Sequence, residues 1–329
     1  MKKIVLSIIL IMILILCSIW IYIDTEKEEK NELTSITLAE VTHSVFYAPL
    51  YAAIENGYFE DEGIDLEVIL TPGADAVSAA VISGDAQIGF AGAESAVYIY
   101  EGGQKDYLQI FAGLTTRDGQ FIVSREKMED FSLEYLKGKE ILTGRLSGMP
   151  ALSFLNSLDN NGISQNELKI NSSVEFAALT GSFIAGEGDF VNLFEPNATL
   201  LQNEGYGYIV ASVGELSGEV PYTTFYSKKS YLKDNKEILE KFTNAINKGL
   251  NYVSNTDSKD IANLIISQFP DEDINNLIDM IENYKLTNSW LESPFISEKL
   301  FNNLEDFLIK FDLLENNTSY KNIVNNLYK

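Results

Sequence analysis

The sequence predicts an α/β fold with two lobes, followed by a helical C-terminal part. Strand-like and helix-like segments alternate from residue 34 to about residue 227, which is typical of a mostly parallel sheet with helices on both faces. After residue 227 only helical patterns occur. The chain has 329 residues, enough for two domains with ordinary cores.

The first third of the chain contains short segments separated by turn residues. Gly57, Pro72-Gly73 and Ser83-Gly84-Asp85 provide the breaks, because glycine and proline end regular structure. The expected strands are residues 36–41, 65–70 and 87–91, and the expected helices are residues 48–55, 75–82 and 94–100.

The middle third repeats this alternation, and the last third is helical. The expected strands are residues 120–124, 139–143, 169–173, 190–194, 208–212 and 222–227, with helices at 149–160 and 175–185. The expected C-terminal helices are residues 230–254, 258–268, 271–285, 297–312 and 318–327. We expect these helices to pack back onto the first lobe, with crossovers at 120–124 and 223–227. Lobe 1 would then comprise residues 34–122 and 225–329, and lobe 2 residues 123–224.

The N-terminus carries a candidate membrane segment at residues 4–23. This run of 20 residues has no charge and matches the roughly 30 Å hydrocarbon core of a bilayer. Two lysines precede it and an acidic stretch follows it, which places the bulk of the protein outside the cytoplasm. Residues 1–23 are therefore expected to tether the protein to the outer face of the cell membrane, and residues 24–33 to act as a linker.

Two fates of this segment remain open. Leu14-Ile15-Leu16-Cys17 resembles a lipoprotein box, in which Cys17 would be lipidated after cleavage of the signal. The apolar run continues past Cys17 to residue 23, which favours an uncleaved signal anchor. Cys17 is the only cysteine, so no intrachain disulfide can form.

Composition and motifs argue against several classes of function. The net charge of −24 makes nucleic acid an improbable partner. Phosphate-binding and dinucleotide-binding glycine motifs are absent, as is a His-Glu-x-x-His motif. His43 is the only histidine and has no Gly-x-Ser-x-Gly partner motif. We therefore expect no catalytic site, metal site or cofactor.

Four loops at the ends of predicted strands are the candidate ligand site, because open α/β sheets bind ligands at the carboxyl ends of their strands. Glu94 and Glu195 would suit an amino group or a cation, whereas Arg145, Arg117 and helix N-termini would suit an anion. Several aromatic residues could enclose a flat ring, although an aromatic beside a strand also suits a core. The candidate ligand-binding residues are His43, Phe46, Tyr47, Gly92, Glu94, Ser95, Arg145, Gly148, Phe194, Glu195 and Tyr222.

Five short patterns between residues 46 and 92 give the chain a family resemblance. They are FYAPLYAA at 46–53, ENGYFE at 55–60, GIDLE at 63–67, SGDAQIG at 83–89 and the glycine loop at Gly92. In this order they resemble the nitrate, sulfonate, taurine and thiamine-precursor binding proteins of ABC importers. The likeness covers residues 36–103, and extends more loosely to about residue 255.

The resemblance implies a type II periplasmic-binding fold, in which two lobes joined by two crossover strands close over one solute. It also implies delivery of the solute to a permease driven by a cytoplasmic ATPase, by a monomer without a cofactor. The loops at 43–47, 92–95, 145–149 and 194–195 would line the pocket. Both an aliphatic sulfonate, taurine or nitrate and a thiamine pyrimidine precursor remain possible solutes.

Two other functions stay open beside import. The domain could be a tethered sensor that passes its ligand state to another membrane protein. The resemblance also extends to enzymes that make the thiamine pyrimidine by consuming their own histidine and a bound pyridoxal phosphate, for which His43 would be the candidate. A secreted protein lacks the cytosolic supply of that cofactor, so we expect a binding protein and no enzyme.

Overall fold

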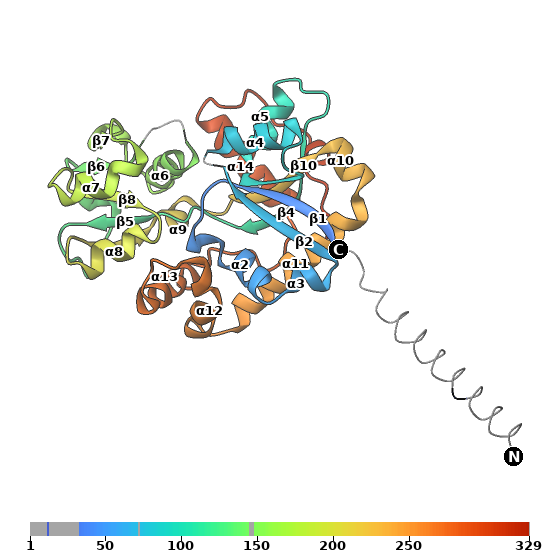
Figure 1. Ribbon diagram of the computed structural model, residues 1–329. Coiled ribbons are helices and arrows are strands. Elements are labelled where there is room, and N and C mark those ends of the chain that lie inside the picture. The colour runs from blue at the N-terminus through green and yellow to red at the C-terminus, as the bar shows by residue number, and fades with distance from the viewer. Residues whose placement is uncertain (1–11, 13–32, 72, 145–147, 329) are drawn as a thin grey trace, which may run out of the picture. The chain divides into compact units, whose positions relative to one another are not determined.

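The computed structural model describes residue 12 and residues 33–71, 73–144 and 148–328 (Figure 1). From Ser35 onward the chain forms one compact unit. Within its described residues this unit holds two five-stranded sheets, each flanked by helices. The second sheet and helices α6 to α9 lie on the left of Figure 1, and the first sheet lies on the right.

The first sheet has the strand order β2-β1-β3-β10-β4. Side chains on β10 alternate between its two faces: Phe225 packs on Phe242 of α11, and the Tyr226 hydroxyl lies 3.3 Å from that of Ser78 in α4. The sheet is therefore covered by helices on both faces. Its strands are β1 (Thr34–Glu40), β2 (Ile64–Leu70), β3 (Ile88–Gly92), β4 (Leu108–Thr115) and β10 (Thr223–Lys228).

The second sheet has the order β7-β6-β8-β5-β9. Its strands are β5 (Phe121–Ser124), β6 (Glu140–Leu142), β7 (Lys169–Asn171), β8 (Phe190–Leu193) and β9 (Tyr208–Ser212). Its helices are α6 (Met149–Asn160), α7 (Leu179–Ile184), α8 (Asn197–Asn203) and α9 (Val213–Ser217).

Both sheets are mostly parallel in strand direction, as expected, with one strand in each that runs against its neighbours. β1 pairs in parallel with β3, and β6 with β7 and β8. However, β10 is antiparallel to β3 and β4, and β5 is antiparallel to β8 and β9. β5 and β10 are the first strands after the chain passes between sheets, and each runs against its neighbours.

The chain passes to the second sheet between β4 and β5, and returns between β9 and β10. The expected crossovers at 120–124 and 223–227 coincide with β5 and β10, but each of these strands pairs within a single sheet. The passages lie immediately before them. The lobe boundaries stay a prediction.

Strand β4 was absent from the sequence-based prediction. All eight of its residues are buried, so it lacks the alternation of polar and apolar residues that marks a half-buried strand. Near its ends β4 is bridged by Val324, which pairs with Ile110, and by Trp290, which pairs with Thr115. C-terminal segments therefore complete the first sheet.

The helical C-terminal part differs from the prediction in two places. The expected helix at 230–254 is divided at Asn235 into α10 (Lys229–Asp234) and α11 (Lys236–Asn255). The expected helix at 318–327 is only α15 (Tyr320–Ile323), because the following backbone bonds to β4: the Asn325 N–H donates to the Ile110 carbonyl at 2.8 Å. The other three are α12 (Ser258–Ile265), α13 (Ile274–Leu286) and α14 (Glu298–Lys310).

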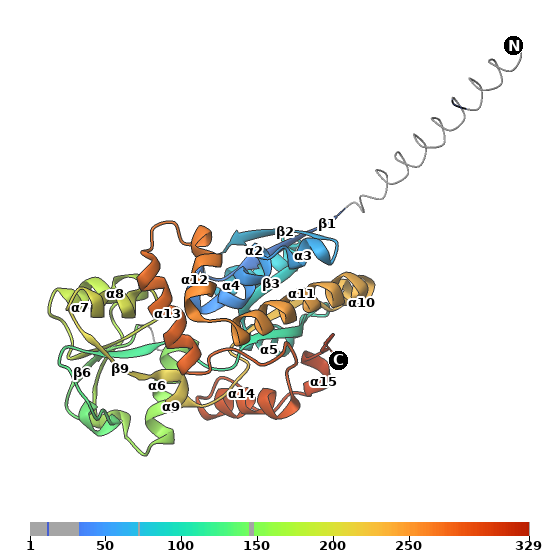
Figure 2. The same cartoon turned by 90° about the horizontal axis from the view of Figure 1, so that it is seen from below.

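The two sheets, each with its own helices, are here called the two halves of the unit. Helix α13 contacts both halves, since it packs on the 3-10 turn η1 (Val45–Tyr47) of the first and on α8 of the second (Figure 2). The remaining helices and 3-10 turns are short. They are α2 (Ala48–Glu55), α3 (Tyr58–Asp61), α4 (Ala74–Ser83), α5 (Glu94–Glu101), η2 (Leu133–Leu136), η3 (Gln165–Glu167), η4 (Phe176–Ala178) and η5 (Ile266–Gln268).

The predicted membrane segment at 4–23 lies outside the described residues, apart from Met12, and so does Cys17. Among the residues that the structure describes, no helix combines the length and the apolar character needed to span a bilayer.

Candidate functional site

A cavity of about 630 Å³ opens where the ends of β1, β3 and β8 meet the starts of α6 and β10. Both halves of the unit contribute to its wall, as expected for a site at the carboxyl ends of strands. Nine predicted site residues line it: His43, Phe46, Tyr47, Gly92, Glu94, Gly148, Phe194, Glu195 and Tyr222. Whether they contact a ligand stays a prediction.

Two of the predicted cationic or polar residues, Ser95 and Arg117, lie elsewhere. Ser95 is buried behind the cavity wall, with its hydroxyl toward that of Tyr226, because each helical step turns the side chain by about 100°. Arg145 lies outside the described residues. Arg117 pairs with Glu219 at 2.9 Å beside a separate cavity of about 530 Å³.

Glu94 is the carboxylate in the cavity wall that has an unused acceptor. Gly92 makes room for it, because a Cβ at position 92 would lie 2.1 Å from the Glu94 Oε2 atom. Oε2 is buried and accepts no hydrogen bond within the described part of the chain. Burial, with a smaller contribution from the charge of Asp75, raises the pKa of Glu94 to about 7.

Glu195, by contrast, has protein partners for both carboxylate oxygens. Oε1 accepts from the Thr199 hydroxyl and from Asn283 Nδ2, and Oε2 accepts from the Thr199 N–H, all at 2.8 Å. The Glu195 N–H also donates to the Tyr284 hydroxyl at 3.2 Å. The residue thus caps α8 and joins it to α13, while burial raises its pKa. Its role as an acceptor for a ligand stays a prediction.

Aromatic side chains form one wall of the cavity. The ring of Phe46 lies 5.9 Å from that of Phe194 and 6.0 Å from that of Tyr222, between ring centroids. It also lies 5.1 Å from the ring of Tyr284 in α13, which the sequence analysis did not single out. Phe46 itself is buried, so this wall is at once part of the core and part of the site.

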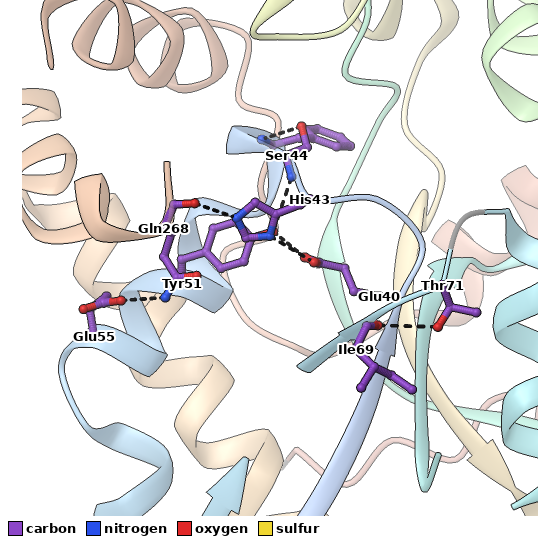
Figure 3. A network of polar contacts seen from close by, with 9 residues as sticks. Glu40, His43, Ser44, Tyr51, Glu55, Ile69, Thr71 and Gln268 are labelled. Carbon is purple, nitrogen blue, oxygen red and sulfur yellow. Dashed lines mark hydrogen bonds and ion pairs between the residues drawn. The ribbon is translucent and has the colours of Figure 1, made fainter. Parts of the chain in front are cut away.

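His43 belongs to a polar network at the rim of the cavity (Figure 3). Its Nε2 atom lies 2.9 Å from the Gln268 carbonyl, which can only accept, so Nε2 carries a hydrogen. Its Nδ1 atom lies 3.2 Å from Glu40 Oε2, and the Tyr51 hydroxyl donates to the other Glu40 oxygen. The bond to Glu40 raises the pKa of His43 above its usual value. Both ring nitrogens are therefore occupied by protein groups.

This network predicts a pH-dependent stability. Because the pKa of His43 is raised above 6.5 on folding, its contribution is fully present below about pH 6.5 and is lost as pH rises through the folded pKa. We expect His43→Gln to lower the melting temperature more at about pH 6 than at about pH 9. Thermal unfolding of both proteins measures this; Glu94 titrates in both, so it cancels in the difference. Equal losses of melting temperature at the two pH values would show that the ion pair between His43 and Glu40 is not the cause.

Comparison with known proteins identifies the family. The protein-family model described as "NMT1/THI5 like" matches residues 45–258. A Bacillus subtilis (strain 168) protein, named "Putative binding protein YtlA", is 40% identical over 299 residues, covering 91% of this chain and 90% of that protein.

The chain belongs to the NMT1/THI5-like family. The solved structure of the alkanesulfonate-binding protein SsuA from Xanthomonas axonopodis pv. citri, bound to MOPS, is similar with a TM-score of 0.67 at 15% identity. The match covers 90% of this chain and 99% of that one. A Candida albicans gene product, CA3427, described as having the generic periplasmic binding protein fold, matches with a TM-score of 0.62 at 13% identity. It covers 87% of this chain and 92% of that one.

These comparisons confirm the family resemblance and the periplasmic-binding fold of this NMT1/THI5-like protein. The name of YtlA is that of a binding protein, which agrees with the expectation of a binding protein rather than an enzyme. Of the predicted ligand-binding residues, only His43 precedes the segment that the family model matches.

The sequence analysis missed the residues that α13 adds to the site. Asn283 and Tyr284 hold the side chain and the backbone of Glu195, although they lie nearly ninety positions away along the chain. No motif marks them, since an asparagine and a tyrosine on an amphipathic helix carry no signal of their neighbours. Within the described residues, no group of three or more His, Cys, Asp and Glu side chains could hold a metal ion.

Proposed function

We propose that this protein is the extracytoplasmic solute-binding component of an ABC importer, which captures a small organic solute and delivers it to a permease. The observation that carries this proposal is the cavity of about 630 Å³, lined from both halves of a periplasmic-binding fold. Its volume lies within the roughly 300–1,000 Å³ of small-molecule sites. Residues 4–23 would tether it, either as a signal anchor or through lipidation at Cys17.

The described wall of the cavity favours a solute with hydrogen-bond donors and a flat ring. It includes the carboxylates of Glu94 and Glu195, and none of its described residues is Lys or Arg. Phe46, Phe194 and Tyr222 offer aromatic surface from both halves. We therefore place an amino-substituted heteroaromatic, such as a thiamine pyrimidine precursor, first among the solute classes.

A sulfonate, taurine or nitrate is the second candidate. The similar SsuA structure is named for alkanesulfonate binding. The start of α6, a helix of 12 residues, reaches the cavity at Gly148 and Met149, and helix N-termini favour anions. Arg145, three residues earlier, would add a positive charge.

Two other functions receive less support. A synthase-like role for His43 needs a ring nitrogen that can react, and both of its nitrogens are held by protein groups. A tethered sensor would use the same cavity, so gene neighbours separate the two: a permease and an ATPase indicate import, and a kinase indicates sensing.

The pH dependence of binding should identify the solute class through Glu94. Since the pKa of Glu94 is about 7, a solute that donates N–H bonds or carries a positive charge should bind more tightly above pH 7, where the carboxylate is ionised. An anion should bind more tightly below pH 7. Calorimetry of the full chain in detergent with 4-aminopyrimidine, ethanesulfonate and nitrate measures both directions.

The Glu94→Gln substitution should reduce this pH dependence and weaken binding of 4-aminopyrimidine by about tenfold. Glu101→Gln, an exposed position at the other end of α5, is the matched control and should change neither quantity. A Glu94→Gln protein that keeps the wild-type pH profile would exclude Glu94 as a ligand contact.

A further inference from the structure

A cluster of buried polar side chains lies behind the cavity wall. Asp118, Gln120 and Asn192, here called the inner polar cluster, are 1%, 0% and 0% exposed. Both side-chain polar atoms of Gln120, both of Asn192, and Asp118 Oδ2 have no hydrogen-bond partner within the described residues. Buried polar atoms are nearly always paired, because an unpaired one loses its hydration without compensation. Such a concentration of unpaired atoms therefore calls for a partner.

The three residues lie together at one end of β5 and β8, two neighbouring interior strands of the second sheet. Asp118 Oδ1 accepts from the Gln120 N–H at 2.7 Å. Ile122 of β5 lies opposite Asn192 of β8 in the antiparallel register. Gln120, two residues before Ile122, therefore projects from the same face as Asn192 and is its diagonal neighbour.

Residues of the cavity wall adjoin this cluster. Phe194, two positions after Asn192, lines the cavity, and so does Tyr222, whose hydroxyl faces the Asp118 carboxyl. The hydroxyl of Ser153, one turn of α6 beyond Pro150 in the cavity wall, also faces Asp118. Movement of the Tyr222 or Phe194 side chain would open the cluster to the cavity.

We propose that the inner polar cluster is an inner part of the solute site, which takes an uncharged group carrying both a donor and an acceptor. Such a group is a carboxamide, or the edge of a ring where an amino group adjoins a ring nitrogen. The inference rests on the proposed function, since it requires a solute in the cavity.

The hydrogen-bond donors and acceptors of the inner polar cluster determine which group it prefers. Each primary amide of Gln120 and Asn192 offers N–H donors and an oxygen acceptor, so a group of mixed character can satisfy both. A sulfonate or nitrate offers acceptors alone and would leave the two amide oxygens unpaired. Burial raises the pKa of Asp118 to about 7, so its carboxyl can donate or accept near neutral pH.

The test separates solute contacts from structural groups by comparing stability with affinity. Gln120→Met and Asn192→Leu replace the amides by apolar side chains of similar shape. Without solute, we expect the melting temperature of the full chain in detergent to stay within about 2 °C of wild type or to rise, because unpaired buried groups are removed. Affinity for 4-aminopyrimidine should fall by about tenfold or more, and affinity for ethanesulfonate, which offers acceptors alone, should change by less than about twofold.

Gln109→Met is the matched control. Gln109 is also a buried glutamine on a strand, 7% exposed, but its Nε2 donates to the Asn322 carbonyl at 2.8 Å. Loss of this paired amide should lower the melting temperature by about 2 °C or more and leave both affinities unchanged.

Four results would overturn the inference. One is a loss of stability in Gln120→Met and Asn192→Leu as large as in Gln109→Met, which would show that these amides are paired in the protein. Another is an unchanged affinity for 4-aminopyrimidine in both variants, or an equal loss for both probes. The last is a wild-type protein that binds ethanesulfonate and not 4-aminopyrimidine. If neither probe binds the wild type, the proposed solute classes and this inference fail together, whereas a wild type that binds 4-aminopyrimidine with variants that bind it equally well overturns this inference alone.

Discussion

The Gly249→Val substitution is expected to lower the free energy of unfolding by about 3 kcal/mol. Gly249 lies where α11 crosses α2, and a Cβ there would be 2.1 Å from the Pro49 carbonyl oxygen and 3.0 Å from the Ala53 Cβ. A backbone oxygen cannot swing aside as a flexible side chain does, so the two helices would have to separate. Since α2 directly follows η1, which carries Phe46 and Tyr47 to the cavity, solute binding should weaken too.

Urea unfolding of wild type and variant measures this difference. Asn251→Val, an exposed position on the same helix, is the matched control for the poor helix propensity of valine, and should cost less than about 1 kcal/mol. If the two valine variants lose the same free energy, the helix crossing tolerates a side chain and the prediction is wrong.

The Glu195→Leu substitution should also cost about 3 kcal/mol, because it leaves the Thr199 N–H and the Asn283 amide without their acceptor in a buried place. Glu195→Gln keeps one acceptor oxygen, and we expect a smaller loss of about 1 kcal/mol. The measurement is again urea unfolding, with the exposed Glu204→Leu at the end of α8 as the control.

The same pair of variants tests the second role predicted for Glu195. If Glu195 also accepts from a solute amino group, Glu195→Gln should weaken binding of 4-aminopyrimidine beyond what its stability loss explains. Unchanged calorimetric affinity would leave this carboxylate with the capping and linking role alone. Stability equal to wild type in Glu195→Leu would contradict the hydrogen-bond geometry itself.

Most of the strands and long helices could be predicted from periodicity and turn residues. The exception, β4, shows the limit of that method: its eight residues are all buried, so its pattern does not alternate. The prediction of a helix at 318–327 was wrong for a different reason. Residues from Val324 onward find backbone partners on β4, and such long-range pairing has no local signature.

The candidate site could be predicted in outline and not in its connections. The rule that ligands bind at the carboxyl ends of strands brought nine of the predicted residues to one cavity. It could not distinguish Glu94, with a free acceptor, from Glu195, whose oxygens are used by Thr199 and Asn283. That difference depends on tertiary contacts that composition and spacing do not encode. The inner polar cluster could not be predicted from the sequence for the same reason.

The position of β10 between β3 and β4 has a consequence for how the chain can assemble. The five strands of the second sheet come from one uninterrupted stretch, Phe121 to Ser212. The first sheet, which begins earlier in the sequence, gains the interior strand that joins β3 to β4 only once Lys228 has emerged, and its edge is covered only by Val324. During synthesis from the N-terminus, the half that starts first must therefore be completed last.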